Sequence, residues 1–148
     1  MIPFIPWMSV GWTPERPEES LTGKRIVVVE DEGVTELHLV RSLKRAGLLV
    51  VGAAANGQKG LELVLEHHPD LVLMDIRLPI LDGLEASRRI LEQMQTCIVI
   101  LTGYDMEEYR QKARELGLSG YIVKPVTGKG LIAALEQAYR DYQQQNTP

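Results

Sequence analysis

Five side chains in this 148-residue sequence could act together on a phosphoryl group, because each follows a short apolar run. They are three carboxylates, a hydroxyl and an ammonium: Glu30, Asp31, Asp75, Thr102 and Lys124. Carboxylates that lie close together raise one another's pKa unless a cation lies among them, and Mg²⁺ suits such oxygen ligands. The hydroxyl and the ammonium are donors suited to phosphate oxygens. If the fold brings the five together, one carboxylate could attack a phosphoryl group while Mg²⁺ neutralises the developing charge.

The apolar runs before these residues lack polar alternation, which is typical of β-strands covered on both faces. Five runs are predicted to be strands: residues 26–29, 49–53, 71–74, 97–101 and 120–123. Segments with helical spacing of apolar residues alternate with them. This alternation predicts an α/β fold with a doubly wound parallel sheet, helices on both faces and right-handed crossovers. The carboxyl ends of parallel strands meet at one edge, where such sheets hold their ligands.

Local signals place the helix boundaries. The third helix is predicted to run from Gly83 to Met94. The fourth is predicted to begin after an N-cap at Asp105 and to end at Leu116, before Gly117. The polar residues 143–146 predict that the last helix fades there.

Composition narrows the class of protein. A hydrophobic content of 45% and a charged content of 24% are typical of one globular domain of this length. The net charge of −4, without a basic stripe, argues against binding to nucleic acid. No stretch approaches the ~20 apolar residues of a membrane span. The single cysteine, Cys97, lies in a predicted strand, which favours a buried thiol and a reducing cytoplasm.

The N-terminal residues 1–23 differ from the rest of the chain. Prolines without a period predict a flexible arm, and the lack of a basic n-region argues against a signal peptide. Trp7 and Trp12 leave open whether this arm docks on the domain or on a partner. Residues 24–142 are predicted to form the domain and residues 143–148 a polar tail, with no repeat and no second domain.

Five motifs at the strand ends resemble a response-regulator receiver domain, the chemotaxis-type module of two-component signalling. They are Val-Val-Glu-Asp-Glu (28–32), Met-Asp-Ile-Arg-Leu-Pro (74–79), Asp-Gly-Leu-Glu-Ala (82–86), Leu-Thr-Gly (101–103) and Gly-Tyr-Ile-Val-Lys-Pro (120–125). The resemblance covers about residues 24–142. It implies the flavodoxin-like (βα)5 fold with strand order 2-1-3-4-5.

By position, the resemblance makes Asp75 the phosphoacceptor for a histidine kinase or a histidine phosphotransfer protein. Glu30 and Asp31, with Asp75 and the backbone carbonyl of Arg77, would hold Mg²⁺ (or Mn²⁺). Glu30 stands where the family more often has Asp, and its longer carboxylate still serves in relatives. At most, such a domain catalyses its own phosphorylation and dephosphorylation.

The resemblance also implies a switch. Lys124 would bind the phosphoryl group, and the Lys124–Pro125 peptide bond would be cis. Thr102 would be the switch hydroxyl and Tyr121 the switch aromatic. The result would be a change in the face that runs from the fourth strand to the fifth helix, where a downstream protein could bind. A homodimer could form through the fourth helix, the fifth strand and the fifth helix.

Two bulky residues stand at positions that in this family tune the hydrolysis of the acyl phosphate. These are Arg77 and Tyr104. Because both could shield the acyl phosphate from water, we expect slow self-dephosphorylation.

Other functions that use an aspartate or a phosphate site fit these residues less well. A phosphatase with an Asp nucleophile would need a second Asp two residues after Asp75, where Arg77 stands. A flavin- or nucleotide-binding module would need a phosphate-binding loop after the first strand, where the acidic residues 30–32 would repel phosphate. Two alternatives stay open: a phosphorylation-independent pseudo-receiver, and a receiver fragment of a longer regulator with a nucleic-acid-binding output. We expect a stand-alone receiver.

Overall fold

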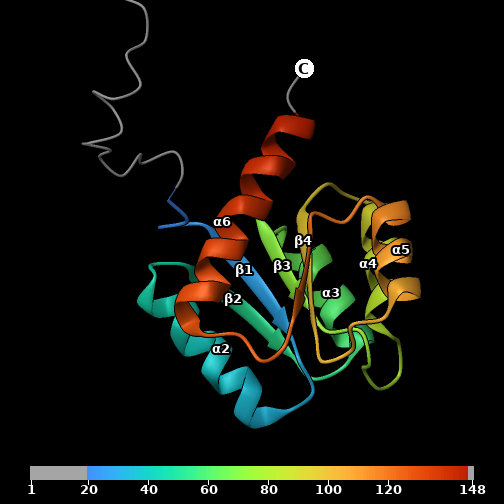
Figure 1. Ribbon diagram of the computed structural model, residues 1–148, viewed down its shortest axis with the longest axis horizontal. Coiled ribbons are helices and arrows are strands. Elements are labelled where there is room, and N and C mark those ends of the chain that lie inside the picture. Colours follow the sequence, from blue (N-terminus) through green and yellow to red (C-terminus); the bar gives the residue numbers. More distant parts are fainter. Residues whose placement is uncertain (1–19, 147–148) are drawn as a thin grey trace, which may run out of the picture.

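A parallel five-stranded sheet forms the centre of the molecule, and a computed structural model describes it within residues 20–146 (Figure 1). The strand order is β2-β1-β3-β4-β5, which confirms the predicted fold class and order. The elements in chain order are β1 (Arg25–Val29), α2 (Gly33–Arg45), β2 (Leu49–Ala54), α3 (Gly57–His67), β3 (Leu71–Met74), α4 (Gly83–Leu91), β4 (Cys97–Thr102), α5 (Glu107–Leu116), β5 (Gly120–Val123) and α6 (Gly128–Gln145).

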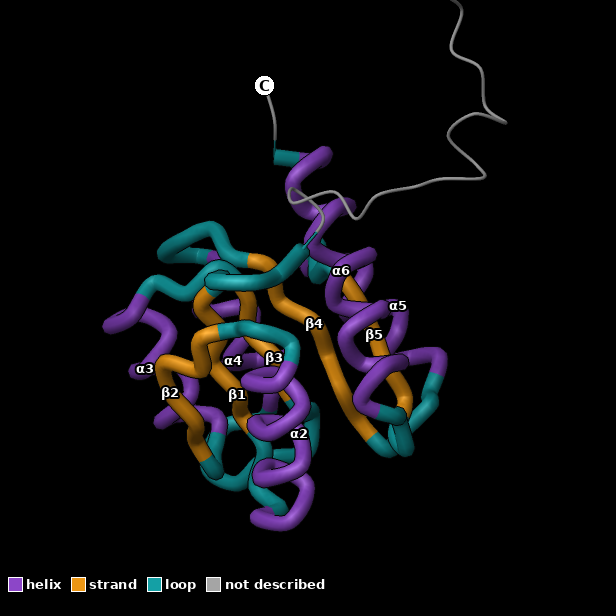
Figure 2. Tube along the Cα trace, turned by 90° about the vertical axis from the view of Figure 1, so that its left-hand side faces the viewer, coloured by secondary structure: helices purple, strands orange, loops and turns teal. Residues whose placement is uncertain are grey.

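Two apolar layers hold the helices on the sheet. On one face, alternate residues of β1, β3 and β4 pack against α2 and α6. On the other face, the intervening residues pack against α3, α4 and α5. Figures 1 and 2 show this sandwich, with α2 and α6 on one side of the sheet. Because β1, β3 and β4 are covered on both faces, their sequences read as continuous apolar runs rather than alternating ones.

The central strands are the best buried part of the chain. Every residue of β3 and β4 is buried, including Cys97 in the first position of β4. Burial raises the pKa of the Cys97 thiol to about 12, so this cysteine is an inert core residue, as its sequence context indicated.

Two helix boundaries differ from the sequence predictions. Helix α4 ends at Leu91 rather than Met94, because the N–H groups of Gln93 and Met94 both donate to the carbonyl of Ile90 and close a tighter turn. Helix α5 begins at Glu107 with Met106 at its N-cap.

Asp105 is therefore not the N-cap of α5. Its carboxylate instead accepts a hydrogen bond from the Arg110 guanidinium, at 2.6 Å.

The ends of the domain also differ from the composition-based boundaries. Leu21 is buried in the core, and the N–H of Gly23 donates to the carbonyl of Gly47 at 2.8 Å, so residues 20–23 pack with the domain. At the other end, α6 continues through Gln145, beyond residue 142. The rest of the predicted arm, with Trp7 and Trp12, lies outside the described residues, as do residues 147–148. Among the helices that are described, none is long and apolar enough to cross a membrane.

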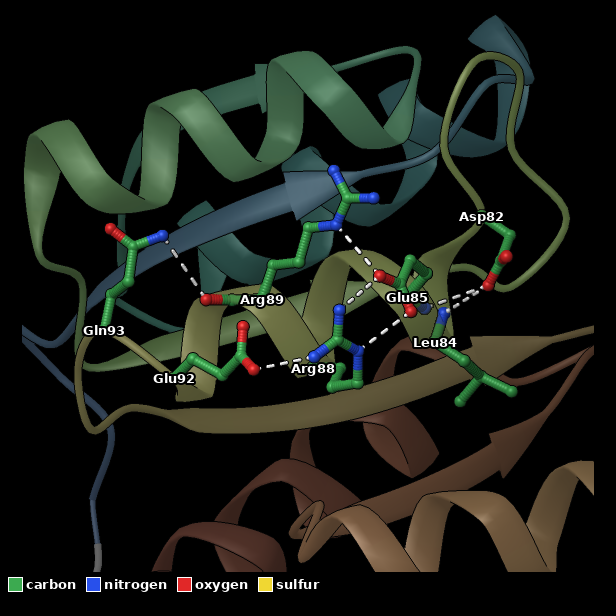
Figure 3. Close-up of polar contacts among 7 residues, drawn as sticks. All are labelled: Asp82, Leu84, Glu85, Arg88, Arg89, Glu92 and Gln93. Atoms are coloured by element: carbon green, nitrogen blue, oxygen red, sulfur yellow. Dashed lines mark hydrogen bonds and ion pairs between the residues drawn. The ribbon is translucent and has the colours of Figure 1, made fainter.

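Helix α4 follows the loop after β3 and is capped by its own sequence. The Asp82 carboxylate accepts hydrogen bonds from the backbone N–H groups of Leu84 and Glu85, at 2.9 and 3.0 Å (Figure 3). This is the N-cap geometry that satisfies otherwise unpaired helical donors. The cap fixes where the loop that carries Asp75 ends.

The exposed side of α4 holds a network of charged side chains. Glu85 pairs with Arg88 at 2.6 Å and with Arg89 at 2.9 Å, and Arg88 also pairs with Glu92 at 2.7 Å (Figure 3). The spacings of three and four residues place these side chains on neighbouring turns. Hydrogen bonds from Arg88 and Arg89 lower the pKa of Glu85 to about 2.

Candidate functional site

The four strands that carry the predicted site residues end at the same edge of the sheet. Val29 of β1 lies beside Met74 of β3, so Glu30 and Asp75, one residue further on, are neighbours. On the other side, Thr102 of β4 lies beside Val123 of β5, which brings Lys124 to the same edge. The parallel register therefore brings together residues far apart in the sequence.

Lys124 joins the two buried carboxylates. Its Nζ atom lies 2.6 Å from Glu30 Oε1 and 3.0 Å from Asp75 Oδ2. Glu30 is 2% exposed and Asp75 is 7% exposed. Two carboxylates thus share one ammonium in a site with little access to water.

The second oxygen of each carboxylate is held by the backbone. Glu30 Oε2 accepts a hydrogen bond from the Glu32 N–H at 3.1 Å, and Asp75 Oδ1 accepts one from the Ile76 N–H at 2.7 Å. Both side chains are therefore fixed in orientation before any ligand binds. Each carboxylate keeps further acceptor capacity for a ligand.

Burial and hydrogen bonding shift the pKa values of two members of this cluster, Glu30 and Lys124. Burial raises the pKa of Glu30 above its ordinary value, although the hydrogen bond from Lys124 opposes the rise. For Lys124, burial acts to lower the pKa, but hydrogen bonds to Glu30 and Asp75 outweigh it and raise the pKa. The lysine stays protonated, and the site favours additional positive charge.

Asp31 completes a group that fits a divalent cation. Glu30, Asp31 and Asp75 each offer a carboxylate oxygen, and these atoms lie within 4.8 Å of one another. Asp31 is exposed whereas the other two are buried. Among residues 20–146 this is the one such group of metal-ligating side chains. An all-oxygen donor set open to water on one side suits Mg²⁺ or Mn²⁺.

Gly83 lies directly against the backbone of Asp75. A Cβ atom on Gly83 would lie 1.7 Å from the Asp75 carbonyl oxygen, so no side chain fits at position 83. The Gly83 N–H donates to the Ile76 carbonyl at 2.7 Å. Gly83 was predicted as the start of the third helix and belongs to the motif at residues 82–86. The pair Asp82-Gly83 was the available signal, but which backbone approaches a glycine depends on tertiary packing.

Arg77 and Tyr104 lie against each other. The Arg77 guanidinium lies 3.9 Å from the centre of the Tyr104 ring, a cation–π contact. A hydrogen bond with Tyr109 raises the pKa of Arg77 further. Tyr109 could not be predicted as a neighbour of Arg77 from the sequence, because its place on α5 gives no sign of contact with the β3–α4 loop.

The predicted switch residues are in contact through Tyr104. Thr102 is buried, and its Oγ1 atom accepts a hydrogen bond from the Tyr104 N–H at 3.3 Å. The Tyr121 hydroxyl donates to the Tyr104 carbonyl at 2.6 Å, and the Arg110 guanidinium lies 4.6 Å from the centre of the Tyr121 ring. The Tyr121 ring is half-buried and points toward the β4–α5 loop. Next along the chain, the Lys124–Pro125 peptide bond is cis.

The fold and this edge define a doubly wound α/β domain with an acidic, lysine-bridged site at the strand ends. Comparison with known proteins gives the family. The family model described as "Response regulator receiver domain" matches residues 26–136. The chain therefore belongs to the response regulator receiver domain family, and the resemblance seen in the sequence is confirmed.

Similar curated proteins are longer than this chain. It is 34% identical over 125 residues to the transcriptional regulatory protein PdtaR of Mycobacterium tuberculosis, a match that covers 84% of this chain and 61% of that protein. It is 35% identical over 122 residues to the transcriptional regulatory protein AfsQ1 of Streptomyces coelicolor, covering 82% and 54%. The chain thus spans about three-fifths or less of the length of these relatives.

A similar solved structure is the signal receiver domain of the putative response regulator NarL from Mycobacterium tuberculosis. The TM-score is 0.76 at 26% identity, and the match covers 80% of this chain and 98% of that one.

Proposed function

We propose that this receiver domain accepts a phosphoryl group on Asp75, in a reaction that depends on Mg²⁺ or Mn²⁺. The donor would be a histidine kinase or a histidine phosphotransfer protein of a two-component system. The observation that carries the proposal is the position of Lys124, whose Nζ lies 2.6 Å from Glu30 and 3.0 Å from Asp75 in a buried acidic cluster.

The chemistry follows from how Asp75 is held. Its Oδ1 atom accepts a hydrogen bond from the Ile76 N–H, and its Oδ2 atom accepts one from Lys124. In the transfer, an Asp75 carboxylate oxygen forms a bond to phosphorus as the bond from phosphorus to the donor histidine nitrogen breaks. Lys124 would then pair with a phosphoryl oxygen in place of its contact with Asp75.

The metal ligands would be Glu30, Asp31, Asp75 and the backbone carbonyl of Arg77. A bound divalent cation would supply positive charge opposite the phosphoryl oxygens. Support comes from the donor set itself, because its three carboxylate oxygens lie within 4.8 Å of one another and, among residues 20–146, a single lysine pairs with two of these side chains.

The switch would use residues that already contact one another. Thr102 Oγ1 accepts a hydrogen bond from the Tyr104 N–H, and its O–H would turn to donate to the new phosphoryl group. The Tyr121 ring would then give up its bond to the Tyr104 carbonyl and move toward the vacated space. These movements would alter the face formed by α5, β5 and α6, where a downstream protein or a second copy of the chain would bind.

Arg77 and Tyr104 would set the lifetime of the phosphorylated state. Their stacked side chains belong to the two loops beside Asp75 and Thr102, which supports a role in keeping water from the acyl phosphate. We also propose that the domain acts in the cytoplasm, where the phosphodonor would transfer its phosphoryl group to this site.

The deciding experiment compares the wild-type protein with the Asp75→Asn variant, each with Mg²⁺ and a small phosphodonor. Intact-mass measurement should find one added phosphoryl group on the wild type only, and only with the metal. Asp141→Asn is a matched control, because Asp141 bonds Gln137 on α6, far from the site. Equal labelling of the Asp75→Asn variant, or none of the wild type, would refute the proposal.

A further inference from the structure

A cavity of about 370 Å³ lies at the opposite edge of the sheet from Asp75. Its walls come from the turns that lead into β3 and β4 and from the last turns of α6. The rings of Tyr139 and Tyr142 stack with their centres 5.9 Å apart and form one of these walls. The proposed phosphoryl transfer makes no use of this cavity.

The lining has the chemistry that an indole ring needs. Tyr142, Met94 and Pro69 offer apolar and polarisable surface, and aromatic rings and methionine sulfur both make favourable contacts with an aromatic side chain. Asp70 and Gln95 add hydrogen-bond acceptors to the same lining. A buried tryptophan needs such an acceptor for its ring N–H.

The N-terminal arm enters the domain beside this cavity. The Lys24 Nζ atom lies 5.4 Å from the centre of the Tyr139 ring, and the Arg25 N–H donates to Asp70 Oδ2 at 2.8 Å. Leu21, near the end of the predicted arm, belongs to the same core cluster as Tyr139. In Figure 1 the blue segment that starts the described chain accordingly lies next to α6.

The arm carries both tryptophans of the chain, Trp7 and Trp12. Trp12 precedes Ser20 by eight positions, a length that can span at most about 28 Å. Pro14 and Pro17 lie between them and restrict the backbone, which lowers the entropy lost on docking. A tether of this length holds its end at an effective concentration of the order of millimolar, so even a weak contact would be occupied.

We propose that Trp12 docks into this cavity and holds the N-terminal arm against α6 of its own chain. The indole ring lies against Tyr142 and Met94, with its N–H directed at Asp70. The arm is thereby tied to a helix that also contributes to the face proposed to change on phosphorylation. The docking itself does not depend on Asp75 chemistry.

Tryptophan fluorescence tests this directly, because no tryptophan lies in residues 20–146. Two full-length variants, Trp7→Phe and Trp12→Phe, each retain one indole. With excitation selective for tryptophan, the Trp7→Phe protein should emit at shorter wavelength and resist acrylamide quenching severalfold better than the Trp12→Phe protein. Equal, water-like emission from both variants would overturn the proposal.

Two changes in the cavity then locate the docking site, both made in the Trp7→Phe background. Tyr142→Ala removes the stacking surface, and Gln95→Tyr fills the cavity from an exposed position without touching the core. Each should shift Trp12 emission to that of a solvent-exposed indole, while circular dichroism checks the fold. Tyr104→Ala, which removes a tyrosine at the other edge of the sheet, should leave the Trp12 emission unchanged.

The cavity variants and a dilution series distinguish docking in this cavity from docking elsewhere on the chain and from binding to a second copy. Protected emission that survives both cavity variants would mean that Trp12 docks elsewhere. Protection that disappears on dilution would mean that it binds a second copy. Either result contradicts docking within the chain at this site, and neither bears on phosphorylation of Asp75.

Discussion

Two clusters of ionisable side chains in this domain have nearly the same contact distances and very different surroundings. At the sheet edge, Lys124 lies 2.6 and 3.0 Å from Glu30 and Asp75. On α4, Glu85 lies 2.6 and 2.9 Å from Arg88 and Arg89. The Glu30 side chain is 2% exposed, whereas that of Glu85 is 31% exposed and those of its partners exceed 40%.

The difference that matters is charge balance under burial. The α4 network pairs two arginines with two glutamates, so its charges cancel, and water and salt screen what is left. The sheet-edge cluster has three carboxylates and one lysine, and two of the carboxylates are buried. Desolvation leaves that surplus negative charge uncompensated. The balanced cluster is a surface feature, and the unbalanced one is where we propose that a cation and a phosphoryl group bind.

The largest effect should come from removing the lysine of the buried cluster. Lys124→Met leaves Glu30 and Asp75 without their shared donor. Loss of one such donor typically slows a reaction by about 10²- to 10³-fold, and we expect this loss in the rate of Asp75 phosphorylation. Without metal, unpaired buried acceptors should also lower the free energy of unfolding by about 1–3 kcal/mol.

Single-turnover labelling and urea unfolding measure the two effects of Lys124→Met. Lys129→Met, an exposed position at the start of α6, is the matched control and should leave both unchanged. A Lys124→Met protein that is phosphorylated at the wild-type rate would show that the bridge does not assist the chemistry.

The second largest effect should come from Glu30, whose substitution should raise stability and weaken Mg²⁺ binding. Because burial raises the pKa of Glu30, its charged form is disfavoured in the folded protein at neutral pH. Glu30→Gln should therefore raise the thermal unfolding midpoint in metal-free buffer and weaken Mg²⁺ binding at least about tenfold. Calorimetry with and without Mg²⁺ tests both. An unchanged Mg²⁺ affinity would remove Glu30 from the ligand set.

A smaller effect is expected from Arg77, which lies beside the cluster but stacks on Tyr104. Arg77→Ala should speed hydrolysis of the acyl phosphate severalfold, because it opens a path for water. The measurement is the decay of phosphorylated protein after the donor is removed. A short lifetime in the wild type that Arg77→Ala leaves unchanged would contradict the shielding role.

The smallest effect should be at the balanced cluster. Glu85 has a folded pKa of about 2 against an ordinary value of 4.5, so its pairing stabilises the fold fully above pH 4.5 and is lost as pH falls toward 2. Glu85→Gln should therefore lower the unfolding midpoint only slightly at pH 7, and not at pH 2. Added salt should shrink the difference at pH 7. A large, salt-independent drop in the unfolding midpoint would contradict the difference between the two clusters.

The sequence was sufficient for the sheet and for where each site residue lies along it. Strands buried on both faces leave uninterrupted apolar runs, and parallel pairing then brings Glu30, Asp75 and Lys124 to one edge. Contacts that arise only from packing were not predictable. Arg77 forms a hydrogen bond with Tyr109, and Gly83 lies against the Asp75 carbonyl. Both contacts depend on how α4 and α5 pack on the sheet.

The predicted start of α5 and the predicted N-terminal end of the domain differ from the structure for a related reason. Asp105 has the right residue type to cap α5, but Arg110 draws its carboxylate into an ion pair. Leu21 lies in a segment rich in proline and acid, yet the core has room for its side chain. Neither the ion pair with Arg110 nor the burial of Leu21 can be predicted from local residue propensity.

The buried thiol of Cys97 has a practical consequence for labelling chemistry. With a pKa of about 12, it presents almost no thiolate at neutral pH and is shut inside β4. Thiol-directed dyes or spin probes should therefore ignore the native chain. A cysteine introduced at Trp12 or on α6 would be the one reactive handle, so distances across the molecule could be followed without first removing the natural cysteine.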